Sequence, residues 1–309
     1  MKAIQIRAFG GPEVMEFVET PEPMPGPNEV VIEVHAASVN PADGKMRDGS
    51  MNQYGALKLP RILGRDFSGT IAAVGAGISD LRPGDAVFGI ADRLKDGTHA
   101  ETHVIDAALV AKKPKTLSHI AAAALGVAAA SALTALEFAA QIKSGDRVLV
   151  HAGAGGVGHY AIQYARKKGA HVIATARAEN HDFVKSMGAH EAVDYTAVDF
   201  STVVKDCDFV LDTLGGEAHA KSMACLKPGG TLAWLNAAPL PQTPARLDIK
   251  VVHAIVKAAR PQMERVGQLA AEGTLRPHVS ATFPLERAVE AYKLIETGRT
   301  RGKIVLTVR

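Results

Sequence analysis

Cysteine is scarce in this sequence, and its scarcity excludes two kinds of architecture. The chain of 309 residues has two cysteines, Cys207 and Cys225, which are separated in the sequence and form no Cys-X-X-Cys pair. Neither the disulfide framework of a small secreted domain nor a four-cysteine zinc lobe can be built from them. We therefore expect a protein of a reducing compartment, the cytoplasm.

A strong charge of one sign is also absent. The formal net charge is +3 and the lysines and arginines are scattered, which predicts neither a nucleic-acid partner nor an anionic membrane surface. Arg7 and Glu13 interrupt the apolar segment that a secretory signal would need near Met1. With 47% hydrophobic and 22% charged residues, the composition is that of a globular enzyme, and the length suits two domains.

Long hydrophobic runs are limited to residues 120–142, where Glu137 is the only charged residue. This segment is long enough to cross a bilayer. It consists mostly of weakly hydrophobic alanine, however, and Gly126 and Ser131 interrupt it. We expect two packed, buried helices here and no membrane span.

A glycine-rich stretch is the most informative feature that the sequence does contain. Residues 147–151 form an apolar run that predicts a buried strand, and apolar positions recur with helical spacing over residues 157–165. The glycines between them predict a tight turn, because glycine permits positive φ and close approach of a ligand to the backbone. The start of the following helix would attract a pyrophosphate. The residues expected to bind it are Gly153, Ala154, Gly155, Gly156, Val157 and Gly158.

A tight loop without a ligand is the alternative interpretation of this stretch. A second strand is expected at residues 171–175, about 20 residues later, where a dinucleotide fold recognises the ribose. This context favours a nucleotide site.

The order of the expected elements divides the chain into a β-rich part and an α/β part. Strand-like runs without helical alternation fill the first part, at residues 3–8, 29–39, 69–74 and 86–88. After Ser118, helices and then alternating strands and helices predict a doubly wound parallel sheet. Its strands are expected at residues 147–151, 171–175, 208–212 and 231–235, and its helices at 156–168, 180–187 and 216–226. Residues 250–256 are a further strand candidate, with a helix as the alternative. The tail is expected to form a helix at 261–271, a strand at 279–283, a helix at 285–297 and a strand at 303–308.

The glycine-rich stretch resembles the signature of the quinone oxidoreductase and zeta-crystallin family, a zinc-free branch of the medium-chain dehydrogenase/reductases. The matching residues are Gly145, Asp146, Leu149, Gly153, Ala154, Gly155, Gly156, Gly158, Gln163 and Arg166. The resemblance covers nearly the whole chain. It implies a GroES-like catalytic domain over residues 1–117, an NADPH-binding Rossmann domain over 118–258, and a C-terminal segment, 259–309, that returns to the catalytic domain.

The end of the second strand predicts which nicotinamide cofactor is bound. An NAD-selecting fold places an acidic residue there, but this strand runs into Thr175 and Arg177, with no acid before Glu179. The Arg177 guanidinium suits the 2′-phosphate of NADPH, although a solvated surface arginine is the alternative.

Other cofactor contacts are expected where strands end or where the family places them. Thr175, Thr213, Leu214 and Asn236 follow the carboxyl ends of strands, where ligands of doubly wound sheets bind. The resemblance adds Thr134 beside the nicotinamide and Tyr195 near the adenosine, with a strand-end cap as the alternative for Tyr195.

No metal is expected. The resemblance extends to the zinc alcohol dehydrogenases of the larger superfamily, which bind their metal through a cysteine and a later Gly-His-Glu motif. At the first of these places this chain has Ser38-Val39-Asn40, and at the second it has Gly64-Arg65-Asp66. His99 and His103 are expected in one strand, where residues four apart are separated by about 13 Å, too far to share a metal ion.

Asn40 and Tyr54 are the expected catalytic residues, because the resemblance places their segments in the family's substrate cleft. Asn40 would position the nicotinamide or the substrate carbonyl, and Tyr54 would donate a hydrogen bond or stack on a flat ring. Structural roles are the alternatives nearby: Asp43 as a helix cap and Asp66 as a holder of loop amides.

Together these features predict an NADPH-dependent oxidoreductase that transfers hydride to a quinone or an α,β-unsaturated carbonyl without a metal. A 2-enoyl thioester reductase, or a non-catalytic NADPH-binding protein with a structural or sensory role, is the alternative. The apolar segment 250–256 predicts an edge strand, and pairing of this edge between two chains predicts a homodimer.

Overall fold

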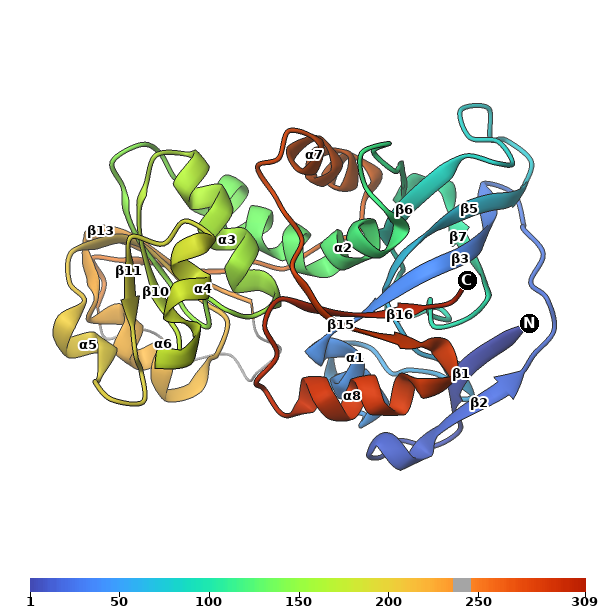
Figure 1. Ribbon diagram of the computed structural model, residues 1–309, viewed down its shortest axis with the longest axis horizontal. Coiled ribbons are helices and arrows are strands. Elements are labelled where there is room, and N and C mark those ends of the chain that lie inside the picture. Colours follow the sequence, from blue (N-terminus) through green and yellow to red (C-terminus); the bar gives the residue numbers. More distant parts are fainter. Residues whose placement is uncertain (236–245) are drawn as a thin grey trace. The chain divides into compact units, whose positions relative to one another are not determined.

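The computed structural model describes residues 1–235 and 246–309 and divides into two compact units (Figure 1). Unit 1 consists of Met1–Val127, Lys257–Gly273 and Pro277–Arg309. Unit 2 consists of Ala128–Val256 and Thr274–Arg276. The C-terminal segment thus belongs to the same unit as the N-terminal one.

Unit 2 contains a parallel sheet of six strands. The strands are β9 (Arg147–Val150), β10 (His171–Thr175), β11 (Glu191–Val193), β12 (Cys207–Asp212), β13 (Leu226–Trp234) and β14 (Lys250–His253). Their order is β11-β10-β9-β12-β13-β14, and every neighbouring pair is parallel. This is the Rossmann order, with its switch point between β9 and β12. The doubly wound sheet predicted from the alternation is confirmed.

Short helices connect these strands. They are α3 (Gly156–Lys167), η5 (Ala178–Asn180), α4 (His181–Ser186), α5 (Phe200–Val203) and α6 (Gly216–Met223). The α3 helix is amphipathic, with Tyr160, Ile162 and Tyr164 among its buried residues and a polar end at Arg166 and Lys167. Strand β14 is an edge of the sheet and ends at His253, three residues earlier than expected. The dimer through this edge stays a prediction.

Unit 1 is β-rich, as the strand-like runs predicted, and its sheets are mostly antiparallel. Its larger sheet follows the order β15-β16-β3-β5-β6-β8, with β7 also paired to β3. These strands are β3 (Glu29–Val39), β5 (Asp66–Val74), β6 (Ala86–Ile90), β7 (Thr102–Asp106), β8 (Val110–Lys112), β15 (Val279–Pro284) and β16 (Lys303–Thr307). A smaller sheet joins β1 (Lys2–Ile6) to β2 (Met15–Glu19) and β4 (Arg61–Ile62). The helical segments are η1 (Pro12–Val14), α1 (Pro41–Arg47), η2 (Asn52–Tyr54), η3 (Ala107–Leu109), α7 (Arg260–Ala271), η6 (Leu285–Arg287) and α8 (Ala288–Glu296).

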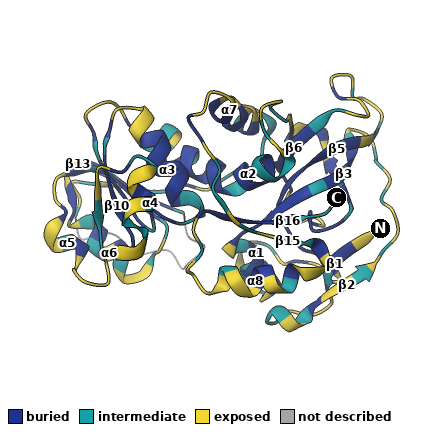
Figure 2. Cartoon of the chain, in the orientation of Figure 1, coloured by how far each residue is buried: buried dark blue, intermediate teal, exposed yellow. Residues whose placement is uncertain are grey.

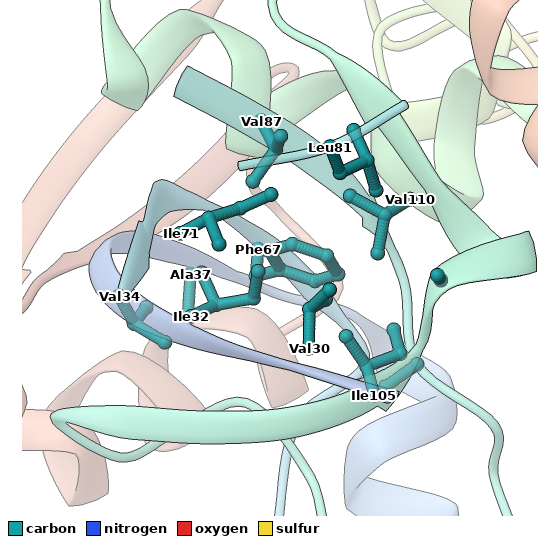
Figure 3. Close-up of a cluster of buried hydrophobic side chains, with 12 residues drawn as sticks. Val30, Ile32, Val34, Ala37, Phe67, Ile71, Leu81, Val87, Ile105 and Val110 are labelled. Atoms are coloured by element: carbon teal, nitrogen blue, oxygen red, sulfur yellow. The ribbon is translucent and has the colours of Figure 1, made fainter. Parts of the chain in front are cut away.

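The core of unit 1 forms where alternate residues of β3 face one side of the sheet. Val30, Ile32 and Val34 are fully buried and pack around Phe67 of β5 (Figure 3). Alternation of side chains across a strand produces such a face. The α8 helix is buried along one face only (Figure 2), and its Tyr292 belongs to a second core cluster.

The alanine-rich run forms α2 (His119–Leu133) followed by the π-helix η4 (Thr134–Ala139). Gly126 interrupts α2 with φ 3° and ψ −125°. The segment His119–Ala139 is long and apolar enough to cross a membrane, and 72% of its most hydrophobic window is buried within the protein. Core helices of globular proteins pass the same test of length and hydropathy. The predicted interruption at Gly126 is confirmed.

Candidate active site

The glycine turn joins β9 to α3, and its backbone corrects one expectation. None of Gly153, Gly155 and Gly158 has positive φ; the left-handed residue is Ala152, with φ 47°. Glycine is required for lack of space instead. A Cβ on Gly153 would lie 2.8 Å from the Cβ of Ala174, and one on Gly158 would lie 2.3 Å from the Ala152 carbonyl oxygen. The turn therefore packs directly against β10 and against itself.

The N-terminus of α3 follows this turn without a side-chain cap. Gly155 is the N-cap residue, and α3 continues for 12 residues. The first turn of a helix leaves backbone N–H groups without helical partners, and the helix dipole adds partial positive charge there. These residues fit the pyrophosphate of a dinucleotide.

Gln163, one of the residues that carried the family resemblance, anchors α3. Its side-chain amide donates to the carbonyl oxygens of His159 and Arg276 at 3.0 and 3.2 Å. Its Oε1 accepts the N–H of Arg276 at 2.9 Å. The glutamine thus fixes the helix to the short Thr274–Arg276 segment of the same unit.

Arg177 follows the end of β10 and contacts Tyr195. The sequence analysis expected both residues near the cofactor but did not predict this contact. The Arg177 Nε–H donates to the Tyr195 hydroxyl at 3.1 Å, and Tyr195 is 48% exposed. This bond raises the pKa of the guanidinium. It uses one of five N–H donors, so four remain on the two terminal nitrogens for a phosphate.

The loop after β12 is shaped by a buried pair that the sequence analysis missed. Asp212 Oδ1 accepts the N–H groups of Leu214 and Gly215 at 2.8 and 2.9 Å, while Oδ2 lies 2.7 Å from His219 Nδ1. Thr213 donates its hydroxyl to the His151 carbonyl at 3.3 Å. Thr213 and Leu214, which are expected to contact the cofactor, therefore lie on a loop whose backbone is fixed by the buried Asp212 carboxylate.

The remaining expected cofactor contacts differ in their surroundings. Thr134 begins η4, and its hydroxyl donates to the Ala130 carbonyl at 2.8 Å. Thr175 is 1% exposed, with its hydroxyl directed to His151 and Ala152. Asn236 lies outside the described residues. Contact of these residues with a cofactor stays a prediction.

In unit 1, Asn40 belongs to a buried ionic cluster with Asp66 and Lys303. The Asn40 amide donates to Asp66 Oδ2 at 2.9 Å, and the Lys303 ammonium donates to Asn40 Oδ1. The ammonium also lies 3.6 Å from Asp66 Oδ2. All three side chains are less than 5% exposed. Lys303 was missed because it is 263 residues from Asn40 in the sequence.

Asp66 holds backbone and side-chain donors from two further segments. Oδ2 accepts the Ser38 hydroxyl at 2.6 Å, and Oδ1 accepts the Val127 N–H at 2.8 Å. A Cβ on Gly126 would lie 2.2 Å from Asp66 Oδ1. Only glycine therefore leaves room for this carboxylate at the point where α2 is interrupted. The alternative role of Asp66 is confirmed in part: it accepts a backbone amide, but that amide lies at the interruption of α2 and not in a loop.

Asp43 is fully buried beside this cluster. Its Oδ2 accepts the Asn40 N–H at 2.8 Å, which confirms its role in capping α1. Its Oδ1 has no hydrogen-bond partner among the residues that the structure describes. Burial and the neighbouring Asp66 raise the pKa of Asp43 to about 7, against the opposing effect of Lys303. The cluster therefore carries an exchangeable proton near neutral pH.

The two expected catalytic residues have different environments. The Asn40 side chain is engaged by Lys303, Asp66 and Asp43, so it organises the cluster. Tyr54 ends the 3₁₀ helix η2 and is 37% exposed. Their catalytic roles stay predictions.

The histidine pair differs from expectation in one respect. His103 lies in β7, but His99 lies outside any strand, with Nε2 3.5 Å from the Ser38 carbonyl and Nδ1 3.3 Å from the Tyr292 hydroxyl. Within residues 1–235 and 246–309, no three His, Cys, Asp or Glu side chains come together as a set of metal ligands.

Two family models match the sequence. Residues 26–115 match the alcohol dehydrogenase GroES-like domain, and residues 187–306 match the zinc-binding dehydrogenase family. Among curated relatives, the mitochondrial NAD(P)H oxidoreductase RTN4IP1 of Mus musculus is 33% identical, over 100% of this chain and 89% of its own length. The chloroplast envelope quinone oxidoreductase homolog of Arabidopsis thaliana is 32% identical, over 99% and 98% of the two chains.

Solved structures give the same result for the whole fold. The quinone oxidoreductase from Coxiella burnetii has a TM-score of 0.91 and 37% identity, covering 100% of this chain and 99% of that one. A structure described as an NAD-dependent alcohol dehydrogenase has a TM-score of 0.93 and 32% identity, with full coverage of both chains. The Escherichia coli quinone oxidoreductase, crystallised with NADPH, has a TM-score of 0.91 and 26% identity, also with full coverage.

Proposed function

Since this chain belongs to the medium-chain dehydrogenase/reductases, in the group of the quinone oxidoreductases, and is a nicotinamide-dependent oxidoreductase, we propose that it transfers hydride from NADPH to a quinone or an α,β-unsaturated carbonyl without a metal ion. The buried cluster of Asn40, Asp66 and Lys303 carries this proposal. It places a buried ammonium group beside Asn40 and Asp66, which lie in the segments that the resemblance matches with the metal-binding segments of the zinc alcohol dehydrogenases.

The choice of NADPH is supported by Arg177 and Tyr195. The tyrosine hydroxyl accepts the Nε–H, which leaves the two terminal nitrogens of the guanidinium for bidentate contact with a phosphate. A nicotinamide cofactor would be held at the turn of Gly153–Gly158 by backbone amides at the start of α3. When bound it supplies the hydride, and the protein supplies binding and orientation.

We expect NADPH to bind more tightly than NADH by roughly 10- to 150-fold, since charge-assisted hydrogen bonds to the 2′-phosphate are worth ~1.5–3 kcal/mol. Arg177→Glu should reverse much of this preference, because a carboxylate there repels the phosphate and accepts a ribose hydroxyl. Fluorescence titration with both cofactors measures the effect. Lys185→Glu, at an exposed position on α4, makes the same change of charge as a control. Equal dissociation constants for the two cofactors in the wild type would refute the prediction.

Independence from metal follows from the charge of the cluster. A divalent ion beside Asn40 and Asp66 would face the buried Lys303 ammonium at short range, where repulsion between like charges is strong. Asp66 already accepts from Ser38, Asn40 and Val127. The residues present therefore fit zinc poorly.

The acceptor follows from where charge develops. Hydride transfer to a saturated ketone forms a localised alkoxide, which needs a metal ion or a strong acid for stabilisation. Transfer to a quinone or enone spreads the charge into a phenolate or enolate, for which a neutral donor such as the hydroxyl of Tyr54, a residue that is 37% exposed, is sufficient. Water can then supply the proton.

An NADPH-oxidation screen tests the proposed function. Quinones and enones should be reduced, whereas benzaldehyde and cyclohexanone should be inert, and dialysis against a chelator should leave turnover unchanged. Enoyl thioesters form a separate arm of the screen. Loss of activity on chelation that zinc restores would refute the metal-free proposal. If NADPH binds but none of the acceptors causes its oxidation, the protein is a cofactor-binding protein instead of an enzyme.

A further inference from the structure

Thr175 ends β10 at a place where it holds the glycine turn from the inside. The regular pairing of β9 with β10 ends at Val150 and Ala174. One residue later, the Thr175 hydroxyl accepts the Ala152 N–H at 3.2 Å, and the Thr175 carbonyl accepts the Gly153 N–H at 2.9 Å. Thr175 thus continues the hydrogen bonding between these segments after the ladder has ended.

The Ala152 conformation that Thr175 supports is unfavourable in isolation. Ala152 has φ 47°, a left-handed conformation that side chains with a Cβ adopt at a cost. Its carbonyl accepts the Gly155 N–H at 2.9 Å and lies where a Cβ on Gly158 would clash. The orientation of this one peptide therefore determines where α3 begins.

His151 fixes the direction of the Thr175 hydroxyl. The Ser222 hydroxyl donates to the Ala218 carbonyl at 2.6 Å, so it accepts from His151 Nε2, which lies 2.8 Å away. With the proton assigned to Nε2 by this network, His151 Nδ1 is an acceptor, and the Thr175 hydroxyl donates to it at 3.1 Å. The hydroxyl oxygen then directs a lone pair to the Ala152 N–H.

The chain of hydrogen bonds is protected from solvent. His151 and Ser222 are fully buried, and Thr175 is 1% exposed. Burial lowers the pKa of His151 to about 4, so the imidazole stays neutral and Nδ1 keeps its lone pair at physiological pH.

We propose that Thr175 and His151 are positioning residues of the nucleotide turn: they hold Ala152 in its left-handed conformation and so place the backbone amides of α3 for the pyrophosphate. The inference rests on the proposed function in that the ligand is a nicotinamide dinucleotide. It gives Thr175 an indirect role in place of the direct cofactor contact expected from the sequence.

The test compares NADPH binding by fluorescence titration with backbone amide exchange in the protein without ligand. Thr175→Val should weaken NADPH binding about tenfold, as expected for one buried hydrogen bond. It should also accelerate exchange at Ala152. Thr175→Ser keeps the hydroxyl and should stay within about twofold of the wild type.

A rescue variant distinguishes positioning from general damage. Glycine adopts left-handed φ at little cost, so adding Ala152→Gly to Thr175→Val should restore most of the affinity. His151→Phe keeps the ring that packs edge-on against Phe200 at 4.6 Å but removes both hydrogen bonds. It should weaken NADPH binding in the same direction, and it serves as the second variant where Thr175→Val does not fold.

Thr202→Val, at an exposed hydroxyl of the same unit, is the matched control and should change neither quantity. Wild-type affinity and exchange in both Thr175→Val and His151→Phe would overturn the positioning role. A wild-type protein that does not bind NADPH would refute the proposed function. In that case exchange at Ala152 alone decides whether Thr175 holds the turn.

Discussion

Replacement of Lys303 by methionine is expected to lower the free energy of unfolding by about 3–5 kcal/mol, the usual effect of removing one partner from a buried ion pair. Lys303 is 2% exposed and lies 3.6 Å from Asp66 Oδ2. Methionine fills a similar volume but leaves Asp66 without its cation and Asn40 Oδ1 without its donor. Guanidinium unfolding at pH 7 measures the difference.

Two further variants show whether charge is the cause. Adding Asp43→Asn to Lys303→Met removes one of the two carboxylates of the cluster. It should therefore recover part of the lost free energy of unfolding. Lys115→Met changes an exposed lysine of the same unit and should leave stability within about 0.5 kcal/mol of the wild type. A Lys303→Met protein as stable as the wild type would show that the buried ammonium contributes nothing net.

The position of Lys303 explains why sequence reasoning found only part of this cluster. The segment 303–308 was correctly predicted as a strand from its apolar run. Its partner was not predictable, because pairing between β16 and β3 joins Ile304 to Val39 across the length of the chain. That register places Lys303 beside Asn40. A lysine at the start of a buried strand was the available signal.

Local patterns were predicted well where short-range physics decides them. The strands at residues 29–39 and 171–175 match the structure at both ends, since apolar runs and flanking turn residues set their limits. The helix expected at 216–226 ends at Met223 instead, because Leu226 already pairs with Cys207. The Lys227-Pro-Gly-Gly230 sequence looks like a turn but continues that strand.

The glycine turn shows both the reach and the limit of motif reasoning. Its place between strand and helix followed from the pattern, but its left-handed residue is an alanine. We infer that this conformation depends on the Thr175 hydroxyl and on His151. A threonine or a histidine in the sequence does not by itself predict such a role. Tertiary hydrogen bonds override the local preference for glycine there.

Acid is expected to destabilise the protein steeply between pH 6.5 and 4. Burial lowers the pKa of His99, His103 and His151 to about 4 from the ordinary value of 6.5. Between these values the unfolded chain binds more protons than the native one, so stability is fully present above pH 6.5 and is lost as the pH falls. Each histidine contributes about 3 kcal/mol to this loss.

Asp43 acts in the opposite direction over the same range. Its pKa is raised to about 7 from 3.8, so the native state binds the extra proton and stability increases as the pH falls from 7 to 3.8. It offsets roughly one of these histidines. Because three buried histidines act in the other direction, the net result over this range is a loss of stability as the pH falls.

The variant His103→Asn tests this expectation in urea unfolding between pH 7.5 and 4.5. Asparagine cannot be protonated in this range, yet it keeps a donor for the Gly97 carbonyl that His103 contacts. The slope of unfolding free energy against pH between 6.5 and 4.5 should decrease by about 1.4 kcal/mol per pH unit, one proton's worth. The variant also loses ring volume, which lowers stability equally at all pH values and leaves the slope unaffected. Thr202→Val replaces an exposed residue that does not titrate and should keep the wild-type slope. An unchanged slope in His103→Asn would show that the buried imidazole does not resist protonation.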